Sequence, residues 1–249
     1  MNQRTNFFDS IPPVTRHLLI LNVLMWVATI AFEKFARIDL TDILGLHYWA
    51  GSKFNPVQFV TYMFMHDPSG PMHLFFNMFS LWMFGRIIER ALGMKRYLLY
   101  YITCGLGAAL VQELVWQFTW QSEFVGLMAL SNSTSTQVIE QALRSGQITE
   151  FADQFCNQLV TVGASGAVFG LLLAFGLMFP NMPLYIIPFP FPIKAKWMVL
   201  GYGVIELVFG MTGSMSSVAH YAHLGGMLFG LLLLLYWRRT NQWGGYGNY

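Results

Sequence analysis

The sequence contains two long stretches with no charged residue, and these limit the possible folds more than any other feature. One runs from Gln154 to Ile193, which is 40 residues, and the other from Leu207 to Trp237, which is 31 residues. A helix needs about 20 apolar residues to cross a bilayer. Each stretch is therefore long enough for at least one membrane span.

The composition of the whole chain agrees with a membrane protein. Of the 249 residues, 55% are apolar and 10% are charged, against about 25% charged in an average soluble domain. Mean hydropathy is +0.48. A disordered chain needs low hydrophobicity and high net charge, and a nucleic-acid-binding protein needs a basic face. A net charge of +2 fits neither class, and the hydropathy excludes an ordinary soluble enzyme.

The apolar segments predict an all-α membrane protein with six spans. The second span is the least hydrophobic, because it carries His73, Asn77 and Arg86. The predicted spans are 15–32, 71–90, 97–118, 162–179, 197–212 and 218–237.

Basic residues collect on the cytoplasmic side of membrane proteins, and this rule orients the spans. With the N-terminus inside, 10 of the 14 Lys and Arg residues lie on the cytoplasmic side. We therefore predict one domain over residues 1–249 with both termini cytoplasmic. Its parts outside the spans are a cytoplasmic tail at 1–14, an external interfacial loop at 33–70 and an external polar insertion at 119–160. The later part of that insertion has an apolar stripe that predicts an amphipathic helix, with Ile148, Phe151, Ala152, Phe155 and Leu159.

Four polar residues fall at one depth in this topology. His73 and Asn77 lie near the outer end of span two, Ser165 near that of span four and His223 near that of span six. At 1.5 Å per residue, all lie within roughly 10 Å of the outer ends. Polar groups inside membrane helices are costly and are candidates for function.

These residue types suit acyl transfer. A serine hydroxyl becomes a good nucleophile when a neutral imidazole takes its proton, which suits Ser165 and His223. His73 and Asn77 share one helix face at i, i+4, where side-chain N–H donors and the backbone N–H of Ser165 could stabilise an oxyanion.

Glycines next to Ser165 and His223 predict how the two meet. Pairs of glycines four residues apart let helix backbones approach closely in lipid. Gly166 and Gly170 form such a pair below Ser165, and Gly226 and Gly230 form one below His223. If these two helix faces are in contact, Ser165 and His223 meet at the outer end of that contact. We assign helix packing to Gly163, Gly166, Gly170, Gly226 and Gly230.

The chain resembles the rhomboid intramembrane serine proteases over nearly its whole length, from span one to span six, and four stretches carry this resemblance. His73–Asn77 resembles the family's HxxxN, and Gly85–Gly93 resembles GxxxExxxG. Gly163–Gly166 resembles GxSG, and Ala222–Gly230 resembles AHxxGxxxG.

The resemblance implies a six-helix rhomboid fold that cleaves other membrane proteins near the outer membrane face. Ser165 matches the nucleophile, His223 the general base, and His73 with Asn77 the oxyanion hole. Phe169 stands where the family often has a tyrosine stacked on the catalytic histidine. No cofactor and no metal is expected. The expected partners are single-pass membrane-protein substrates and the lipid bilayer, with no nucleic acid, and the expected location is the bacterial cytoplasmic membrane.

Three polar residues have no role assigned from the sequence: His66, His220 and Glu206. Spans four and six contain no Asp or Glu, so we predict a Ser/His dyad without a third member. His220 is expected nearer the surface, hydrogen-bonded to water. Two other classes stay open: a catalytically silent rhomboid-like protein that binds membrane helices, and a transporter or channel, which would have its polar path at the midplane.

Overall fold

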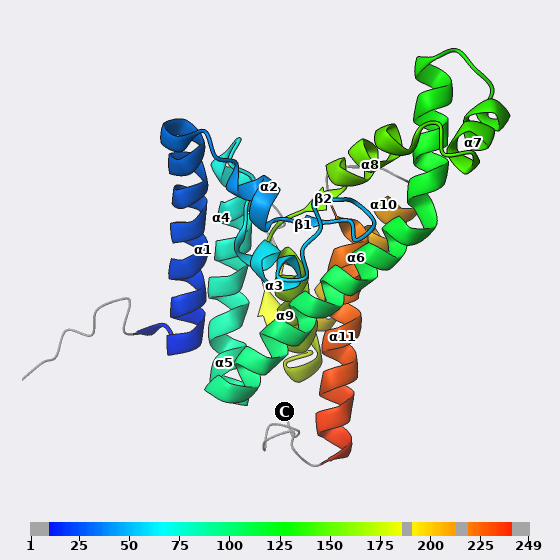
Figure 1. Ribbon diagram of the computed structural model, residues 1–249. Helices are drawn as coiled ribbons and strands as arrows, with labels where there is room; N and C mark the ends of the chain where they lie inside the picture. Colours follow the sequence, from blue (N-terminus) through cyan, green and yellow to red (C-terminus); the bar gives the residue numbers. More distant parts are fainter. Residues whose placement is uncertain (1–9, 186–190, 213–218, 241–249) are drawn as a thin grey trace, which may run out of the picture.

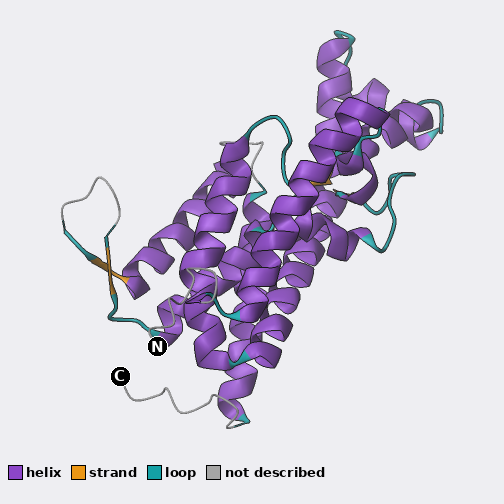
Figure 2. Ribbon diagram, turned by 90° about the vertical axis from the view of Figure 1, so that its left-hand side faces the viewer, coloured by secondary structure: helices purple, strands orange, loops and turns teal. Residues whose placement is uncertain are grey.

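A computed structural model describes residues 10–185, 191–212 and 219–240 of the chain. These residues are mostly helical, and the strands among them form two short pairs (Figure 2). The all-helical fold class predicted from the sequence is therefore confirmed. Most of the predicted N-terminal tail, residues 1–9, and the predicted start of the last span at Val218 lie outside the described residues.

Six long helical segments follow the six predicted spans in order (Figure 1). Four of them are long and apolar enough to cross a membrane: 13–36, α6, α10 and α11. The second segment and α9 do not reach that threshold, so the count of six spans stays a prediction. The segments are α1 (Pro13–Ala31) with η2 (Phe32–Ala36), α4 (Pro71–Ser80) with η4 (Leu81–Gly85) and α5 (Arg86–Leu92), α6 (Met94–Ser131), α9 (Ser165–Met178), α10 (Ala195–Thr212) and α11 (His220–Arg239).

The second segment is one helix with a π-helical turn at its middle, η4. At its lower end the carboxylate of Glu89, which is 2% exposed, caps the start of α1. It accepts hydrogen bonds from the backbone N–H of Val14 (2.9 Å) and from the N–H and hydroxyl of Thr15 (2.7 Å each). N–H groups in a first helical turn have no partner inside the helix. Glu89 thus joins two segments and has a structural role.

Helix α9 lies at the centre of the bundle, packed against α6 and α11 (Figure 1). Ten of its 14 residues are buried, which fits its nearly continuous apolar sequence. A helix of this length is only about 21 Å long, shorter than the roughly 30 Å hydrocarbon core of a bilayer. Ser165, the first residue of α9, can therefore lie below the outer end of the bundle.

Glycines allow α9, α11 and α6 to approach closely. A Cβ atom added at Gly226 would overlap the carbonyl oxygen of Gly166, so the two backbones touch as the glycine spacing suggested. Gly230, in contrast, faces Tyr100 and Cys104 of α6. The predicted two-helix contact is thus a contact of three helices, because small residues of α6 pack against the same faces.

Replacing Gly226 by alanine is expected to destabilise the bundle. The new methyl group cannot fit unless α9 and α11 separate, and overpacking of this kind costs typically 1–3 kcal/mol. The measurement is the apparent melting temperature of the purified protein in detergent. Gly201→Ala in α10 is the matched control, because a Cβ there meets nothing within 4 Å. Equal melting temperatures for the two variants would contradict this account of the packing.

The external loop at 33–70 is folded against the bundle. Tyr48, which lies in this predicted interfacial loop, is fully buried, and its hydroxyl donates to Gln117 of α6 at 2.9 Å. Phe54 and Phe59 pack against the main core. The interfacial position predicted for this loop is wrong for Tyr48, because Trp116 and Trp120 of α6 pack against it. Besides η2, the loop contains α2 (Leu40–Leu44), β1 (Leu46–His47), α3 (Gln58–Thr61) and η3 (Tyr62–Phe64).

The segment at 119–160 is also mostly helical. Helix α6 continues through its first part to Ser131, because no proline interrupts it and because Phe124 and Val125 pack against the helices that follow. The predicted amphipathic helix corresponds to α8, in which Ala152 is buried but Phe151 is 54% exposed. The remaining elements are α7 (Thr136–Arg144), α8 (Thr149–Gln158), β2 (Val160–Thr161), β3 (Pro183–Leu184) and β4 (Ile193–Lys194).

Candidate active site

Ser165 and His223 are in hydrogen-bond contact although 58 residues separate them. The Ser165 Oγ atom lies 2.8 Å from Nε2 of His223. Ser165 begins α9 and His223 lies in the first turn of α11, directly above the contact between Gly166 and Gly226. Ser165 is half-buried and therefore accessible, whereas His223 is 7% exposed. This is the pairing that a serine nucleophile and its base require.

The chain before Ser165 is held in place by the external loop. Strand β2 pairs antiparallel with β1 through Leu46 and Thr161, and the N–H of Gly163 donates to the carbonyl oxygen of Tyr62 at 2.9 Å. Gly163 has φ = 128°, a conformation that favours glycine. It lies outside the helix, so the helix-packing role predicted for Gly163 is wrong. Instead, Gly163 makes the turn that presents Ser165.

Phe169 stacks on the imidazole of His223. The ring centroids are 4.2 Å apart and the planes differ by 7°. Phe169 follows Ser165 by one helical turn, so its ring lies beside the histidine that contacts Ser165. This contact restricts the orientation of the His223 ring.

Glu206, which has no role assigned from the sequence, contacts both histidines of α11. Its Oε2 atom lies 2.9 Å from Nδ1 of His223 and 2.7 Å from Nδ1 of His220. An ionised carboxylate only accepts hydrogen bonds, so both imidazoles carry hydrogen on Nδ1 when they donate to it. Nε2 of a neutral His223 is then free to accept the proton of Ser165. The prediction of a dyad without a third member is therefore wrong, because the carboxylate of Glu206 lies in hydrogen-bond contact with His223.

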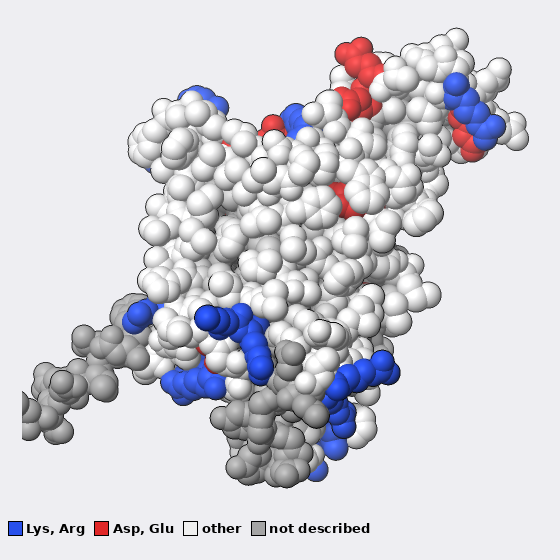
Figure 3. Space-filling view, turned by 60° about the horizontal axis from the view of Figure 1, so that its bottom comes forward, with Lys and Arg blue, Asp and Glu red and all other residues white. Residues whose placement is uncertain are grey.

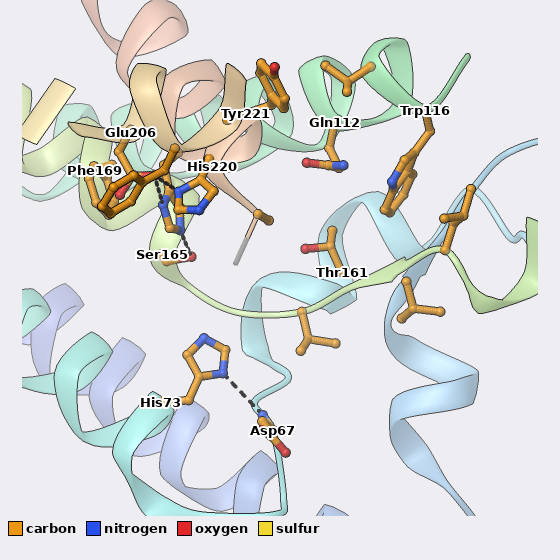
Figure 4. A pocket seen from close by; sticks show the side chains of 18 of the residues that line it. Asp67, His73, Gln112, Trp116, Thr161, Ser165, Phe169, Glu206, His220 and Tyr221 are labelled. Carbon is orange, nitrogen blue, oxygen red and sulfur yellow. Dashed lines mark hydrogen bonds and ion pairs between the residues drawn. The ribbon is translucent and has the colours of Figure 1, made fainter. Parts of the chain in front are cut away.

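His220 also differs from expectation. The sequence predicts a position near the surface, but His220 is 6% exposed and contacts Glu206. The reason is that α10 packs against α11 and brings the carboxylate of Glu206 next to His220 (Figure 4) as well as His223. These three side chains also form a group of potential metal ligands.

His73 lies across the cavity from Ser165, with its ring directed toward it (Figure 4). The backbone N–H of Asp67 donates to Nδ1 of His73 at 3.4 Å. A neutral His73 then carries its hydrogen on Nε2, the atom next to Gly163. The structure therefore presents an N–H donor on the serine side of the cavity.

Asn77 lies one turn below His73 and is 5% exposed. Its Nδ2 atom donates to the backbone carbonyl of His73 at 2.9 Å, which uses one of its two N–H groups. Within the described part of the chain, the hydrogen bonds of both side chains are local, and neither ties the second segment to another helix.

A cavity of about 1050 Å³ connects the side chains of the candidate site. It is lined by His73, Asn77, Ser165, Phe169, Glu206, His220 and His223. Burial lowers the pKa of His66, which packs against the lining residue His73, to about 3, and the neighbouring His73 adds to this effect. The two rings lie 5.1 Å apart. His66 is therefore neutral at physiological pH and packs against His73. The hydroxyl and N–H of Ser69 lower the pKa of Asp67, which stays ionised. Other residues lining the cavity include Gln112, Trp116, Thr119 and Glu123.

Comparison with known proteins identifies the family. The family model of the Rhomboid domain matches residues 53–240, which contain the complete candidate site. The chain belongs to the Rhomboid family. The resemblance drawn from four short motifs is thus confirmed over most of the chain.

Three proteins of the Rhomboid family, from three different organisms, are similar to this chain at 26–29% identity. "Rhomboid protein 1, mitochondrial" of Saccharomyces cerevisiae is 26% identical over 160 residues, covering 64% of this chain and 36% of that protein. "Rhomboid-like protein 11, chloroplastic" of Arabidopsis thaliana is 29% identical over 198 residues, covering 71% of this chain and 51% of that protein. "Rhomboid protease AarA" of Providencia stuartii is 28% identical over 174 residues, covering 69% of this chain and 52% of that protein. The chain spans between about a third and a half of the length of these relatives.

Proposed function

We propose that this protein is an intramembrane serine endopeptidase in which Ser165 is the nucleophile and His223 the general base. The observation that carries the proposal is the 2.8 Å contact between Ser165 Oγ and His223 Nε2, which lies at a cavity within a Rhomboid domain. A relative named as a rhomboid protease supports it.

The proposed reaction is acyl transfer in two steps. His223 Nε2 takes the proton of Ser165 as Oγ attacks the carbonyl carbon of the scissile peptide bond. The imidazolium then gives that proton to the leaving amine, and an acyl-enzyme remains on Oγ. A water molecule from the cavity hydrolyses the ester, again with His223 as the base. Glu206 accepts the Nδ1 hydrogen throughout and so stabilises the imidazolium.

His73, Asn77 and the backbone N–H of Ser165 form the proposed oxyanion hole. The N–H of Ser165 belongs to the first turn of α9 and has no acceptor within the helix. Donors fixed in advance around the developing charge lower the barrier without a cost for reorganisation.

The two other classes are less favoured. A silent helix-binding protein has no need for a serine and a histidine in hydrogen-bond contact. A transporter would have a polar path at the middle of the membrane. Glu206, which lies near the middle of α10, does not form such a path, because its carboxylate contacts His223 of the candidate site.

The proposed substrates are membrane proteins with a single span, cut near the outer face. Figure 3 shows Lys and Arg gathered at one end of the molecule, where α5 and α11 end. Basic residues mark the cytoplasmic side, so we place this end inside and the cavity at the outer face. The bacterial cytoplasmic membrane stays a prediction, because relatives include mitochondrial and chloroplastic proteins.

Covalent labelling tests the proposed nucleophile. A fluorophosphonate probe is expected to modify the purified protein at one site, with the adduct on Ser165 by peptide mass spectrometry. Ser165→Ala is expected to remain unlabelled, since only an activated serine reacts at a useful rate. Labelling of Ser165→Ala equal to wild type would contradict the proposal.

Replacing Asn77 by alanine tests the oxyanion hole. Since several donors share the developing charge, kcat is expected to fall by about 10- to 1,000-fold, with KM nearly unchanged. Labelling of Ser165 is expected to slow as well, because the phosphonyl oxygen occupies the oxyanion position.

The control for Asn77→Ala is the melting temperature of the same preparation. If Asn77 only stabilised the helix, activity would fall in proportion to the unfolded fraction. A variant that melts below wild type but has normal turnover per folded molecule would remove Asn77 from the mechanism.

A further inference from the structure

Glu206, His220 and His223 bring three metal-ligating atoms together beside the proposed base. Each residue offers one ligand atom, either a carboxylate oxygen or an imidazole nitrogen, and the three atoms lie within 4.8 Å of one another. Oε2 of Glu206 contacts Nδ1 of both histidines. The three side chains are 6–9% exposed. His220 and His223 are three residues apart and so share one face of α11, while Glu206 faces them from α10.

The surroundings of this cluster favour a cation. Among the described residues that line the cavity, Asp67, Glu123 and Glu206 are acidic and none is Lys or Arg. Acidic side chains thus outnumber Lys and Arg along the described lining of this cavity, and one of them, Glu206, is itself a ligand. It also reaches all three residues, so an ion and its water can enter.

The donor set selects among cations. Two imidazoles and one carboxylate, with a water in the fourth position, is a known arrangement for Zn²⁺. Ca²⁺ takes six to eight oxygen ligands and Mg²⁺ keeps several waters, so neither suits two nitrogen donors. With bonds of about 2.0–2.2 Å to zinc, tetrahedral ligand atoms lie roughly 3.3 Å apart. The present 2.7 and 2.9 Å contacts would open by about half an ångström as zinc replaces the two Nδ1 hydrogens.

We propose that Glu206, His220 and His223 form a Zn²⁺ site and that zinc bound there keeps the protein inactive. Coordination at Nδ1 leaves the hydrogen of a neutral His223 on Nε2. That atom then donates toward Ser165 Oγ and cannot take its proton. Zinc also binds the carboxylate of Glu206, which then no longer accepts a hydrogen bond from Nδ1 of His223. The inhibitory part rests on the proposed function, whereas zinc binding itself does not.

Cobalt spectroscopy tests the site without any need for activity. The full chain, purified in detergent without a polyhistidine tag, is titrated with Co²⁺, whose visible absorption is intense when the ion is tetrahedral. Wild type and Ser165→Ala are expected to show the same saturable bands at one ion per chain, displaced by Zn²⁺. His220→Asn keeps an N–H donor for Glu206 but removes a ligand, and is expected to lose the bands.

His17→Asn is the matched control, because His17 is exposed on α1, outside the cavity. It is expected to bind Co²⁺ like wild type. Wild-type protein without tetrahedral bands, or bands that persist in His220→Asn, would overturn the proposed site.

Fluorophosphonate labelling of Ser165 tests the inhibition. Zinc is expected to slow wild-type labelling at least about tenfold, since a positioned base contributes 10²–10⁴, and a chelator is expected to restore the rate. Mg²⁺ is expected to have no effect. His220→Asn is expected to label at its basal rate with or without zinc. Equal slowing of wild type and His220→Asn by zinc would overturn the inhibition. Absence of labelling in metal-free wild type would count against the proposed nucleophile and leave the cobalt result as the test of the site.

Discussion

Cleavage of a membrane-protein substrate is expected to fall below about one thousandth of the wild-type rate in Ser165→Ala and equally in His223→Ala. The two residues act as one unit, because the hydroxyl attacks only while the imidazole removes its proton. Removing either member therefore costs about as much as removing both. The measurement is the initial rate of cleavage of a single-span substrate in detergent micelles or liposomes.

The double variant Ser165→Ala/His223→Ala and a control serine complete this experiment. The double variant is expected to match the single variants within about threefold, as for other catalytic units. Ser80→Ala is the control, because Ser80 lines the same cavity and is expected to cleave at the wild-type rate. Near-normal cleavage by Ser165→Ala, or multiplied losses in the double variant, would contradict a catalytic pair.

The order of the helices and the meeting of Ser165 with His223 could be predicted from the sequence. Helix positions follow from apolar segments, because the bilayer fixes both length and composition. The contact between α9 and α11 follows from glycine spacing, since close backbone approach in lipid requires small residues. These signals are local in the sequence, and they placed the helices to within a few residues except at the end of α6.

The extension of α6 and the burial of the loop at 33–70 could not be predicted in this way. Residues 119–131 have no proline or strong turn signal, and whether they continue a helix depends on packing with α7 and α8. Tyr48 is buried in part by Trp120 of that extension, which packs against it together with Trp116. Such contacts join distant parts of the chain, and hydropathy carries no information about them.

Glu206 had a sequence signal that was not converted into a role. An ionisable residue in an apolar helix is a candidate for function, and Glu206 interrupts an otherwise uncharged region. Its partners depend on the rotation of α10 relative to α11. That rotation is a property of the packed bundle, so the single residue suggested a site without indicating the histidines.

Replacing Glu206 by glutamine is expected to lower kcat by about 10²- to 10⁴-fold, the range for a positioned acid–base group and for loss of the orienting carboxylate in a serine triad. Glutamine preserves the shape of the side chain but removes the negative charge. Its amide can also donate to Nδ1 of His223, which favours the wrong tautomer. KM is expected to change little, because the imidazolium forms only in the transition state.

The matched control for Glu206→Gln is Glu123→Gln. Glu123 is a second carboxylate lining the same cavity, but it is exposed and carries no role in the proposed reaction. Its loss changes the charge of the cavity by the same amount, so a general electrostatic effect would appear in both variants. A positioning role predicts a large loss of kcat in Glu206→Gln alone, with the folded fraction confirmed by melting temperature. If instead Glu206→Gln lowers the melting temperature and keeps wild-type kcat per folded molecule, Glu206 only stabilises the packing of α10 against α11, and catalysis depends on Ser165 and His223 without a third member.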